Sequence, residues 1–484
     1  EQMAGDLLPD RTFMTQVASG YNRNHRINSE GGSIPDEWIV EYVADRVETL
    51  GTTFLGLTMN CARCHDHKYD AVSQNDFYSL FAFFNGIDEA GLGPNNGNSP
   101  PFIPVPKSWP DLKPGENKFV VPAKMKIKVV QTSVPRPQPG GANTVMVMHE
   151  LTKPRPTYVL ERGQYERPDK SQQLQPAVPE VIGGWKKDWP GNRIGLAKWL
   201  TDPSHPLTAR VTVNRLWQRL FGLGLVKSSE NFGVQGDHPS HPELLDWLAT
   251  EFIGGGWDLK ATYKMLVTSA AYRQSSVGHS ESDPENRLLS RGPRRRLPAY
   301  AIRDSALVSS GLLVNEIGGP SVRPYMPPRI WKSISNNTYK QDKGDKLYRR
   351  SLYTYWRRTI PPPTMLTFNA AEREVCIVRK DQTITPLQAL TLMNNVTFVE
   401  AARHLAERIM TQEGLTSEDE RITYAFKAIL SRPPSSRELA LLKDDFIHHE
   451  EIFSKNPQAV GQLLKVGEKP NDPKLPSAAL AAYT

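Results

Sequence analysis

Cysteine is scarce in this chain of 484 residues, which contains only Cys61, Cys64 and Cys376. Three cysteines cannot build the disulfide framework of a small secreted protein, so disulfides do not indicate a compartment. Long apolar runs are also missing. Because no stretch of about eighteen apolar residues occurs, the sequence predicts no membrane-spanning helix. The first residues, EQMAGDLLPD, lack the basic start and the apolar core of a signal peptide.

A strong charge of one sign is missing as well. The chain has 59 Lys and Arg against 52 Asp and Glu, and the resulting net charge of +7 is modest for its length. Basic residues concentrate at 291–298 and at 348–358, where aromatic residues are interleaved. No recognisable nucleic-acid-binding module surrounds either stretch, and a modest net charge does not by itself indicate such binding. We therefore interpret both stretches as solvated or structural surfaces and expect no nucleic-acid partner.

Apolar residues recur at helical spacing between residues 36 and 59, which predicts an amphipathic helix that leads directly to Cys61. After the cysteines, Ser73 is followed three residues later by Asp76, the pattern of a capping box at the start of a second helix. We therefore expect the pair of cysteines in a short connection between two helices.

The region from 86 to 180 differs from its surroundings because proline, glycine and asparagine interrupt it. Between these breaks, the segments 118–130, 143–150 and 155–163 favour strands. From residue 192 onward the helical patterns return. The predicted fold class is mainly α with a β-containing, loop-rich central region, an α+β arrangement.

This pattern predicts three domains. Residues 1–85 form a helical segment that carries the cysteine motif, residues 86–180 form a Pro/Gly-rich connecting region with some β structure, and residues 181–484 form a helical C-terminal domain. The chemistry is expected in the first of these parts.

The spacing Cys61-x-x-Cys64-His65 is typical of covalent haem attachment. Two cysteines at this spacing can form thioether bonds to the vinyl groups of one porphyrin, and the histidine that follows can ligate its iron. We therefore predict haem c as the cofactor, with Cys61 and Cys64 as the thioether donors and His65 as an iron ligand.

Two other interpretations of the motif stay open. Cys61, Cys64, His65 and His67 offer the sulfur and imidazole ligands of a tetrahedral zinc site, although the sequence has no second Cys/His cluster to complete a typical structural zinc site. A redox-active dithiol is less favoured, because no βαβ pattern accompanies the motif. Zinc is therefore the alternative cofactor.

A six-coordinate haem needs a second axial ligand, and His25 is our first choice. This histidine lies in a polar loop one predicted helix away from the motif. Met148 and His149 are alternatives from the central region, and a Met ligand would raise the reduction potential. Met59 and His67 lie too close to the motif in sequence to reach the opposite face of the iron.

Arg63 lies between the two cysteines and Lys68 follows the motif, and both are predicted to contact the cofactor. Either cation can pair with a haem propionate and so help to orient the group. The same residues are also compatible with a capped turn that simply leads into the next helix. Both interpretations stay open.

Polar and aromatic residues of the C-terminal part could bind a ligand, because arginine and tryptophan suit anionic or saccharide groups. They also suit packing between domains, which we favour. These residues are Asn214, Arg215, Trp217, His238, His241, Arg349, Arg350, Trp356, Arg357 and Arg358. The lone Cys376 is predicted to be buried and inert.

The chain resembles the planctomycete-type cytochrome c family. Similarity to its cytochrome-like domain lies in GYNRNHRINSEGG and EYVADRVETLGTTFLGLTMNCARCHDHKYDAVSQNDFYSLFAFFN. Similarity to its companion C-terminal domain lies in NRIGLAKWLTDPSHPLTARVTVNRLWQRLFG, FGVQGDHPSHPELLDWLATEF and TPLQALTLMNN. The resemblance covers nearly the whole chain, and both domains carry the label of unknown function.

The resemblance implies a periplasmic protein, since haem is attached in that compartment. Family members usually carry a signal peptide and often a further cytochrome c domain, so we expect this chain to be truncated at both ends. The implied function is electron transfer, either as an oxidoreductase component that oxidises an organic substrate such as a carbohydrate or as a relay to a redox partner protein or further cytochrome domain. A zinc-stabilised binding or scaffold protein is the third hypothesis, so enzyme activity stays open.

Overall fold

The computed structural model of the chain describes residues 1–95, 97–105, 129, 131, 140–141, 143–278, 280–333 and 338–484. Within these residues most regular structure is helical, and the strands form one small sheet. The predicted fold class, mainly α with some β structure, is therefore confirmed.

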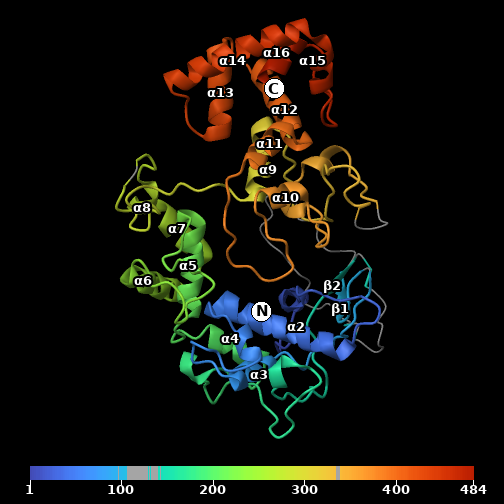
Figure 1. The fold of residues 1–484 in the computed structure, drawn as a ribbon, viewed down its shortest axis with the longest axis vertical. Helices are drawn as coiled ribbons and strands as arrows, with labels where there is room; N and C mark the ends of the chain where they lie inside the picture. The colour runs from blue at the N-terminus through green and yellow to red at the C-terminus, as the bar shows by residue number, and fades with distance from the viewer. Residues whose placement is uncertain are drawn as a thin grey trace. The chain divides into compact units, whose positions relative to one another are not determined.

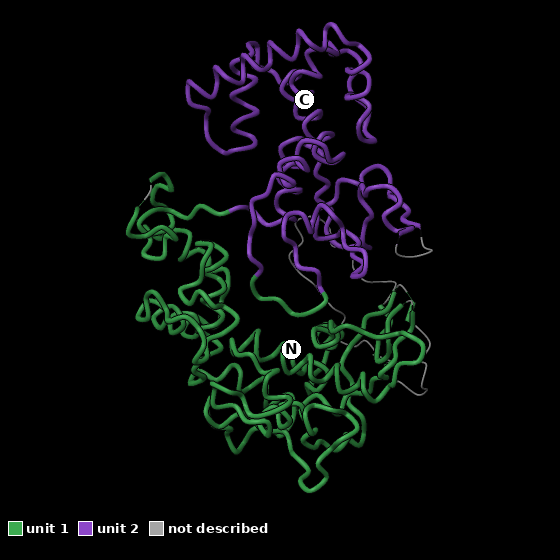
Figure 2. The backbone as a smooth tube through the Cα atoms, in the orientation of Figure 1, with its two compact units in different colours: residues 1–110, 118–295, 374–379 green, residues 111–117, 296–373, 380–484 purple. Residues whose placement is uncertain are grey.

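The described chain divides into two compact units, drawn in different colours in Figure 2. The first unit runs to residue 295 and also contains 374–379, whereas the second comprises 296–373 and 380–484. The division into three domains that the sequence predicts is a separate statement from these two units and stays a prediction.

The first unit contains the helices coloured blue to green in Figure 1. They are α1 (Phe13–Ser19), α2 (Pro35–Leu50), α3 (Gln74–Ala82), α4 (Arg193–Leu200), α5 (Thr208–Phe221), α6 (Pro242–Gly254), α7 (Leu259–Thr268) and α8 (Ala270–Arg273). Helix α2 packs against α3, and α5 packs against both α6 and α7.

Helix α2 ends at Leu50, well before the predicted end at residue 59. A single π-helical turn, Gly51–Leu55, follows, and Gly56 then takes a left-handed conformation with φ of 61°. Gly51 is needed at this point because a Cβ there would lie 2.2 Å from the Cγ atom of Met59. The close approach lets the chain fold back and bury Met59 beneath the end of the helix.

One apolar cluster of the first unit lies between α2 and α3, and another joins α5, α6 and α7. Val43, Val47 and Leu50 of α2 and Phe77 and Leu80 of α3 are almost completely buried in one apolar cluster. Spacing of apolar side chains by three or four residues places them on one face of each helix, as the sequence predicts.

The start of α3 confirms the predicted capping box. The hydroxyl of Ser73 accepts a hydrogen bond from the amide of Asp76 at 3.1 Å, and the carboxylate of Asp76 accepts one from the amide of Ser73 at 2.8 Å. Two amides that the first helical turn would leave unpaired are thereby satisfied.

The β structure is smaller than the sequence suggests. Strand β2 (Thr144–Met146), within the predicted strand 143–150, pairs antiparallel with β1 (Phe102–Pro104). The predicted strand 118–130 lies outside the described residues except for Val129. The predicted strand 155–163 is wrong.

Residues 155–163 form isolated bridges instead, from Thr157 to Leu174 and from Leu160 to Pro168. Their extended conformation is interrupted at Arg162 and Gly163, which have φ of 52° and 72°. Positive φ values are incompatible with a continuous strand, so the chain turns at this point.

The second unit contains α9 (Ala299–Ser310), α10 (Pro363–Thr367), α11 (Pro386–Asn394), α12 (Val396–Thr411), α13 (Glu418–Leu430), α14 (Ser436–Lys455), α15 (Pro457–Leu464) and α16 (Ser477–Tyr483). Helix α12 packs against α9 and α16, and α14 packs against α13 and α16. Several small apolar clusters, rather than one continuous core, hold these helices together. Among the described helices, none is long and apolar enough to cross a membrane.

Candidate functional site

The cysteine motif lies on a short turn between α2 and α3. Residues Asn60–Arg63 form one turn of 3-10 helix, in which Ala62 is completely buried while Cys61 and Cys64 are exposed. A 3-10 helix has three residues per turn, so Cys61 and Cys64 lie on the same side of it. Both thiols are free. Cys61 and Cys64 are therefore both exposed on one face of the turn.

Side chains from both neighbouring helices fix this turn. The carbonyl oxygen of Arg63 accepts hydrogen bonds from the Tyr78 hydroxyl at 3.0 Å and from Gln74 Nε2 at 3.1 Å, both from α3. The Arg63 guanidinium pairs with Glu41 of α2, with 3.0 Å between Nη1 and Oε2. The turn is thus attached to the core before any cofactor binds.

A segment of the central region contacts one of the two thiols and leaves it exposed. Cys64 Sγ donates a hydrogen bond to the carbonyl oxygen of Arg162 at 3.4 Å. A Cβ on Gly163 would lie 3.2 Å from the same sulfur and 3.1 Å from Arg63 Nε. Glycine at this position therefore allows the close approach, and φ of 72° favours it as well.

His65 is exposed directly after the turn. Its Nδ1 atom lies 2.7 Å from the carbonyl oxygen of Asp66, an acceptor that fixes the proton on Nδ1. In this tautomer the lone pair of Nε2 is free to bind a metal. Metal-ligating histidines commonly donate their other ring N–H to a carbonyl oxygen in the same way. The Asp66 carboxylate accepts a hydrogen bond from the backbone amide of Gln74 at 2.8 Å, which anchors this segment to α3.

His67 and Lys68 take different positions. The His67 side chain is buried, where Nδ1 accepts a hydrogen bond from the Asp70 amide at 2.9 Å and Nε2 lies 3.4 Å from Thr58 Oγ1. Lys68 is exposed, and its ammonium group lies 5.2 Å from the centre of the Tyr69 ring. Of the two residues, only Lys68 is accessible to a bound group.

The zinc alternative has no preformed geometry in the described part of the chain. No group of three or more His, Cys, Asp or Glu side chains is arranged there to hold a metal ion. His67 in particular directs both ring nitrogens toward protein atoms.

His25 lies in a buried network of charges. Its Nε2 atom is 2.8 Å from Arg46 Nη2 and 3.5 Å from Glu89 Oε2, and its Nδ1 atom is 2.9 Å from the carbonyl oxygen of Arg26. Burial, assisted by Arg46, lowers the pKa of His25 to about 4. The ring is therefore neutral near pH 7, and each of its nitrogens contacts a protein atom.

Glu89 is the centre of that network. It accepts hydrogen bonds from Arg46 of α2 and from Arg23, and all three side chains are almost completely buried. Burial alone would raise the pKa of Glu89, but Arg46 and Arg23 outweigh burial and hold it well below its usual value. The sequence reasoning missed this network, although Arg46 follows Val43 on the apolar face of α2 and so offered a signal.

The other residues considered as axial ligands lie in different surroundings. Met59 and Met148 are fully buried in the core of the first unit. His149 Nε2 lies 3.1 Å from Gln131 Nε2, and His149 Nδ1 lies 4.0 Å from Asp88 Oδ2. The structure does not describe contacts between these side chains and the motif.

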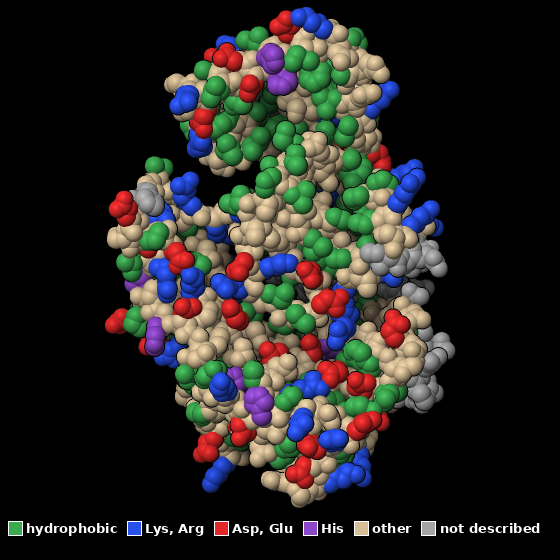
Figure 3. Space-filling view, in the orientation of Figure 1, with side chains coloured by type: hydrophobic (Ala, Val, Ile, Leu, Met, Phe, Trp, Pro, Cys, Tyr) green, Lys and Arg blue, Asp and Glu red, His purple; other side chains and the backbone are tan. Residues whose placement is uncertain are grey.

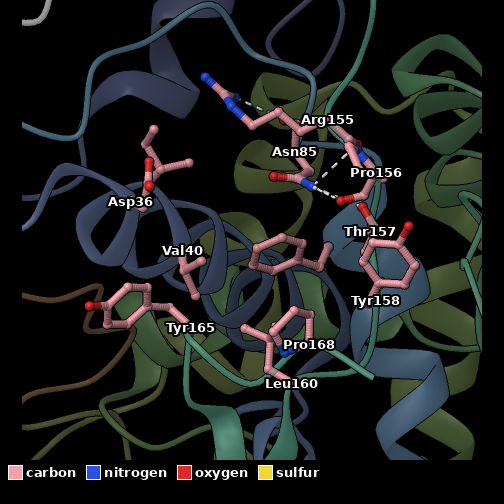
Figure 4. Close-up of a pocket in the computed structure, with 12 residues that line it drawn as sticks. Asp36, Val40, Asn85, Arg155, Pro156, Thr157, Tyr158, Leu160, Tyr165 and Pro168 are labelled. Atoms are coloured by element: carbon pink, nitrogen blue, oxygen red, sulfur yellow. Dashed lines mark hydrogen bonds between the residues drawn. The ribbon is translucent and has the colours of Figure 1, made fainter. Parts of the chain in front are cut away.

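Two cavities lie near the turn. One of about 230 Å³ is lined by Leu160 and Tyr165 of the segment that contacts Cys64, by Val40 of α2 and by Asn85 (Figure 4). Small-molecule sites usually measure about 300–1,000 Å³, so this cavity is small for a ligand.

The second cavity, of about 420 Å³, lies on the α2 side of the turn. Its lining includes Trp38, Glu41 and Glu48 of α2 and Asn60 and Arg63 of the turn. The cavity therefore adjoins the cysteine motif through the face of the turn that does not carry the sulfurs.

The candidate residues of the C-terminal part contact the protein itself. Asn214 exchanges two hydrogen bonds with the backbone of Val226, at 3.0 and 2.9 Å. Trp217 stacks on Phe221 with 3.9 Å between ring centres, and Arg349 donates to backbone carbonyls. These contacts favour the packing interpretation over a ligand site.

The remaining candidates do not converge on one place. The His241 ring lies 3.0 Å from the Ser240 hydroxyl, His238 is exposed, and the Arg373 guanidinium lies 4.1 Å from the centre of the Trp356 ring. On the face drawn in Figure 3, basic and acidic side chains are interspersed over both units. The structure gives Arg350, Arg357 and Arg358 no shared site.

The prediction that Cys376 is buried is wrong, and the prediction that it is inert stays a prediction. Its side chain is exposed and lies 3.4 Å from Thr53 Oγ1. The short segment 374–379 returns from the C-terminal part to the first unit, which places this cysteine at a surface. A lone cysteine carries no local pattern that could have indicated this position.

Two family models match the chain. One, PSCyt2, is described as a protein of unknown function (DUF1549) and matches residues 1–89, which contain the cysteine motif. The other, PSD1, is also described as a protein of unknown function (DUF1553) and matches residues 192–446. No curated protein and no solved structure matches the chain.

Proposed function

The chain belongs to the planctomycete-type cytochrome c family, which pairs the PSCyt2 and PSD1 domains, and from this premise we propose that it is a periplasmic c-type cytochrome that transfers electrons. One haem is attached at Cys61 and Cys64 and ligated by His65. Haem c supplies reversible one-electron chemistry at its iron when it is bound.

The observation that carries this proposal is the shared exposure of three donors. Two free thiols occupy one side of a 3-10 turn, and His65 follows with Nδ1 bonded to a carbonyl oxygen and Nε2 free. Thioether formation requires accessible thiols, and iron ligation requires an unprotonated ring nitrogen. The residues present therefore fit the group that the motif implies.

The chain's own residues orient the attachment turn and set its charge. Tyr78 and Gln74 hold the backbone of Arg63, so the two thiols keep a fixed spacing. Lys68 is exposed and available to a propionate, whereas Arg63 would have to share its guanidinium with Glu41. Of these two cations, Lys68 is thus the better placed partner for the cofactor.

His25 is the residue that would bind the iron as a second ligand. Its neutral ring is the ligating form, but Nε2 would have to exchange its contacts with Arg46 and Glu89 for the iron. Met148 or His149 would replace it if this network stays intact.

The source of the electrons divides the proposal into two forms. A relay between redox partner proteins needs only an accessible haem edge. Oxidation of an organic substrate such as a carbohydrate needs a cavity beside the haem. The cavity of about 420 Å³ lined by Trp38 and Glu41 adjoins the turn on the face away from the two sulfurs, so it does not favour that form over the relay.

Intact-mass measurement tests the attachment. The chain is exported together with a c-type haem maturation system, and the expected result is one covalent haem on the parent and none on the Cys61→Ala, Cys64→Ala double variant. Cys376→Ala is the matched control, because it removes the third exposed cysteine and should keep the haem. A parent that carries no haem and binds zinc instead would favour the scaffold hypothesis.

A further inference from the structure

Residues of the PSD1 domain contact both ends of the loop that carries the cysteine motif in the PSCyt2 domain. On the N-terminal side, the Arg215 guanidinium of α5 donates two hydrogen bonds, one to the carbonyl oxygen of Thr52 and one to that of Thr53. Arg215 lies within the PSD1 match and the two threonines within the PSCyt2 match. The two family domains therefore meet a few residues before Cys61.

The same side of the loop receives a second contact. The Phe232 amide donates a hydrogen bond to the Gly56 carbonyl oxygen at 2.6 Å. A Cβ on Gly56 would lie 2.8 Å from the Phe232 ring and 3.0 Å from Val211. Only glycine fits there, both because of this proximity and because φ is 61°.

The C-terminal side of the loop is held at Asp70. Its carboxylate accepts a hydrogen bond from the Val234 amide at 2.7 Å. A Cβ on Gly233 would lie 2.4 Å from the same carboxylate, so glycine permits the contact. The backbone amide of Asp70 donates a hydrogen bond to Nδ1 of His67 at 2.9 Å, and His67 lies two residues after His65. Asp70 therefore connects the contact with Val234 to the end of the cysteine motif.

The chemistry of Arg215 indicates that positioning, rather than general adhesion, is its role. The side chain is largely buried, it forms no ion pair among the described residues, and its Nε atom has no hydrogen-bond partner there. Burial lowers its pKa. Burial of a cation without an ion pair costs free energy, so it needs compensating hydrogen bonds. The planar guanidinium group can bond two successive carbonyl oxygens and fix their positions, which an apolar side chain could not do.

We propose that residues 211–234 of the PSD1 domain form a clamp that fixes the conformation of residues 52–70. Arg215 and the Gly233–Val234 pair are its positioning residues. The part of this inference that concerns haem rests on the proposed function, in which the clamp sets the reduction potential by holding the attachment turn. A function for the start of the PSD1 domain follows, namely support of the redox loop of its neighbour.

Hydrogen exchange of the haem-free protein tests the clamp directly. We expect Arg215→Ala and Gly233→Ala to speed amide exchange in peptides from 51–72 by about tenfold, since each removes hydrogen bonds that involve a charged group. Arg210→Ala is the matched control on the same helix, because the Arg210 side chain is partly exposed and, among the described residues, bonds Asp246 and the Pro206 carbonyl rather than the loop. Gly191→Ala is the second control, since a Cβ there meets nothing within 4 Å.

Two further readouts separate positioning from charge and from global stability. Arg215→Lys keeps the charge but loses the planar fork, so it should resemble Arg215→Ala in exchange rate. In haem-loaded protein, the midpoint potential should shift in Arg215→Ala and Gly233→Ala and stay unchanged in both controls.

The clamp is overturned if peptides from 51–72 exchange within twofold of the parent rate in both test variants. Exchange that rises equally in peptides from α4, elsewhere in the first unit, would also overturn it, because that result indicates global destabilisation of the unit. If Arg215→Ala does not fold, Gly233→Ala decides. A faster loop in a chain that never takes up haem supports the clamp and contradicts the proposed function, so the two failures are distinguishable.

Discussion

Arg63 and Glu41 form an ion pair that joins the cysteine-bearing turn to helix α2, with 3.0 Å between Nη1 and Oε2. The pair occupies one face of the turn, while Cys61 and Cys64 occupy another. A carboxylate is thereby fixed beside the place where the haem is proposed to attach. Its charge should affect both the stability of the turn and the potential of the cofactor.

Glu41→Gln tests both effects. We expect the free energy of unfolding to fall by roughly 0.5–1 kcal/mol, because the pair is partly exposed. In haem-loaded protein the midpoint potential should rise by roughly tens of millivolts, since a nearby negative charge stabilises the oxidised form. Urea unfolding and a potentiometric titration measure the two quantities. Glu37→Gln, one turn earlier on α2 and exposed, should change neither by as much.

Tyr78→Phe should loosen the turn from the other side. Tyr78 is buried, and its hydroxyl is a donor to the Arg63 carbonyl oxygen. Loss of this hydrogen bond should lower the free energy of unfolding by about 1–2 kcal/mol in urea titrations. Tyr165→Phe is the control, since its exposed hydroxyl donates a hydrogen bond to the neighbouring Glu166 and not to the turn. Equal stability of the two variants would show that the Tyr78 hydroxyl does not hold the turn.

Arg193 should be one of the most sensitive positions of the first unit. Its guanidinium is completely buried and bonds both oxygens of Asp6, at 2.8 and 2.6 Å. Arg193→Ala leaves a buried carboxylate without its partner, so we expect a loss of about 3–5 kcal/mol in the free energy of unfolding. Arg210→Ala at the surface should cost less than about 0.5 kcal/mol. Comparable losses would contradict the account of this ion pair.

His205 should make stability depend on pH. It is buried, and Nδ1 accepts hydrogen bonds from the Leu207 and Thr208 amides at the start of α5, both at 3.2 Å. Burial lowers its pKa to about 4, against an ordinary value of 6.5. As the pH falls below 6.5, His205 therefore binds a proton in the unfolded chain, whereas in the folded chain it binds one only near pH 4. The free energy of unfolding is thus highest above pH 6.5 and falls as the pH decreases.

Between pH 7 and pH 5 we expect His205 to account for a loss of roughly 1–2 kcal/mol in the free energy of unfolding. His205→Asn keeps an acceptor near the helix start but cannot take up the proton, so this part of the pH dependence should disappear. His238→Asn is the control, because His238 is exposed. Urea unfolding at both pH values measures the difference, and an unchanged slope in His205→Asn would refute the assignment.

Local patterns were enough to predict the helices around the motif. The apolar spacing before Cys61 and the Ser73–Asp76 capping box act over a few residues, and the structure contains both features. The helical period predicts the end of α2 too late in the chain. The actual end depends on Gly51 and Gly56, where the backbone packs closely against Met59 and Phe232. A helical period alone cannot show such packing.

The surroundings of the site could not be predicted in the same way. Cys64 contacts Arg162 across 98 residues of sequence, and Asp70 contacts Val234 across 164. These pairs are brought together by the fold and leave no periodic pattern in the chain. The buried pairing of Arg46 with Glu89 is a similar case, since only the position of Arg46 on an apolar face hinted at it.

The most direct test of the central claim is a pyridine haemochrome spectrum of the denatured, exported protein. Covalent attachment at Cys61 and Cys64 should give a c-type spectrum that survives denaturation in the parent and in Cys376→Ala. It should be absent from the Cys61→Ala, Cys64→Ala variant. A parent that loses all haem on denaturation, or a double variant that keeps it, would contradict the assignment of this turn as a haem c site.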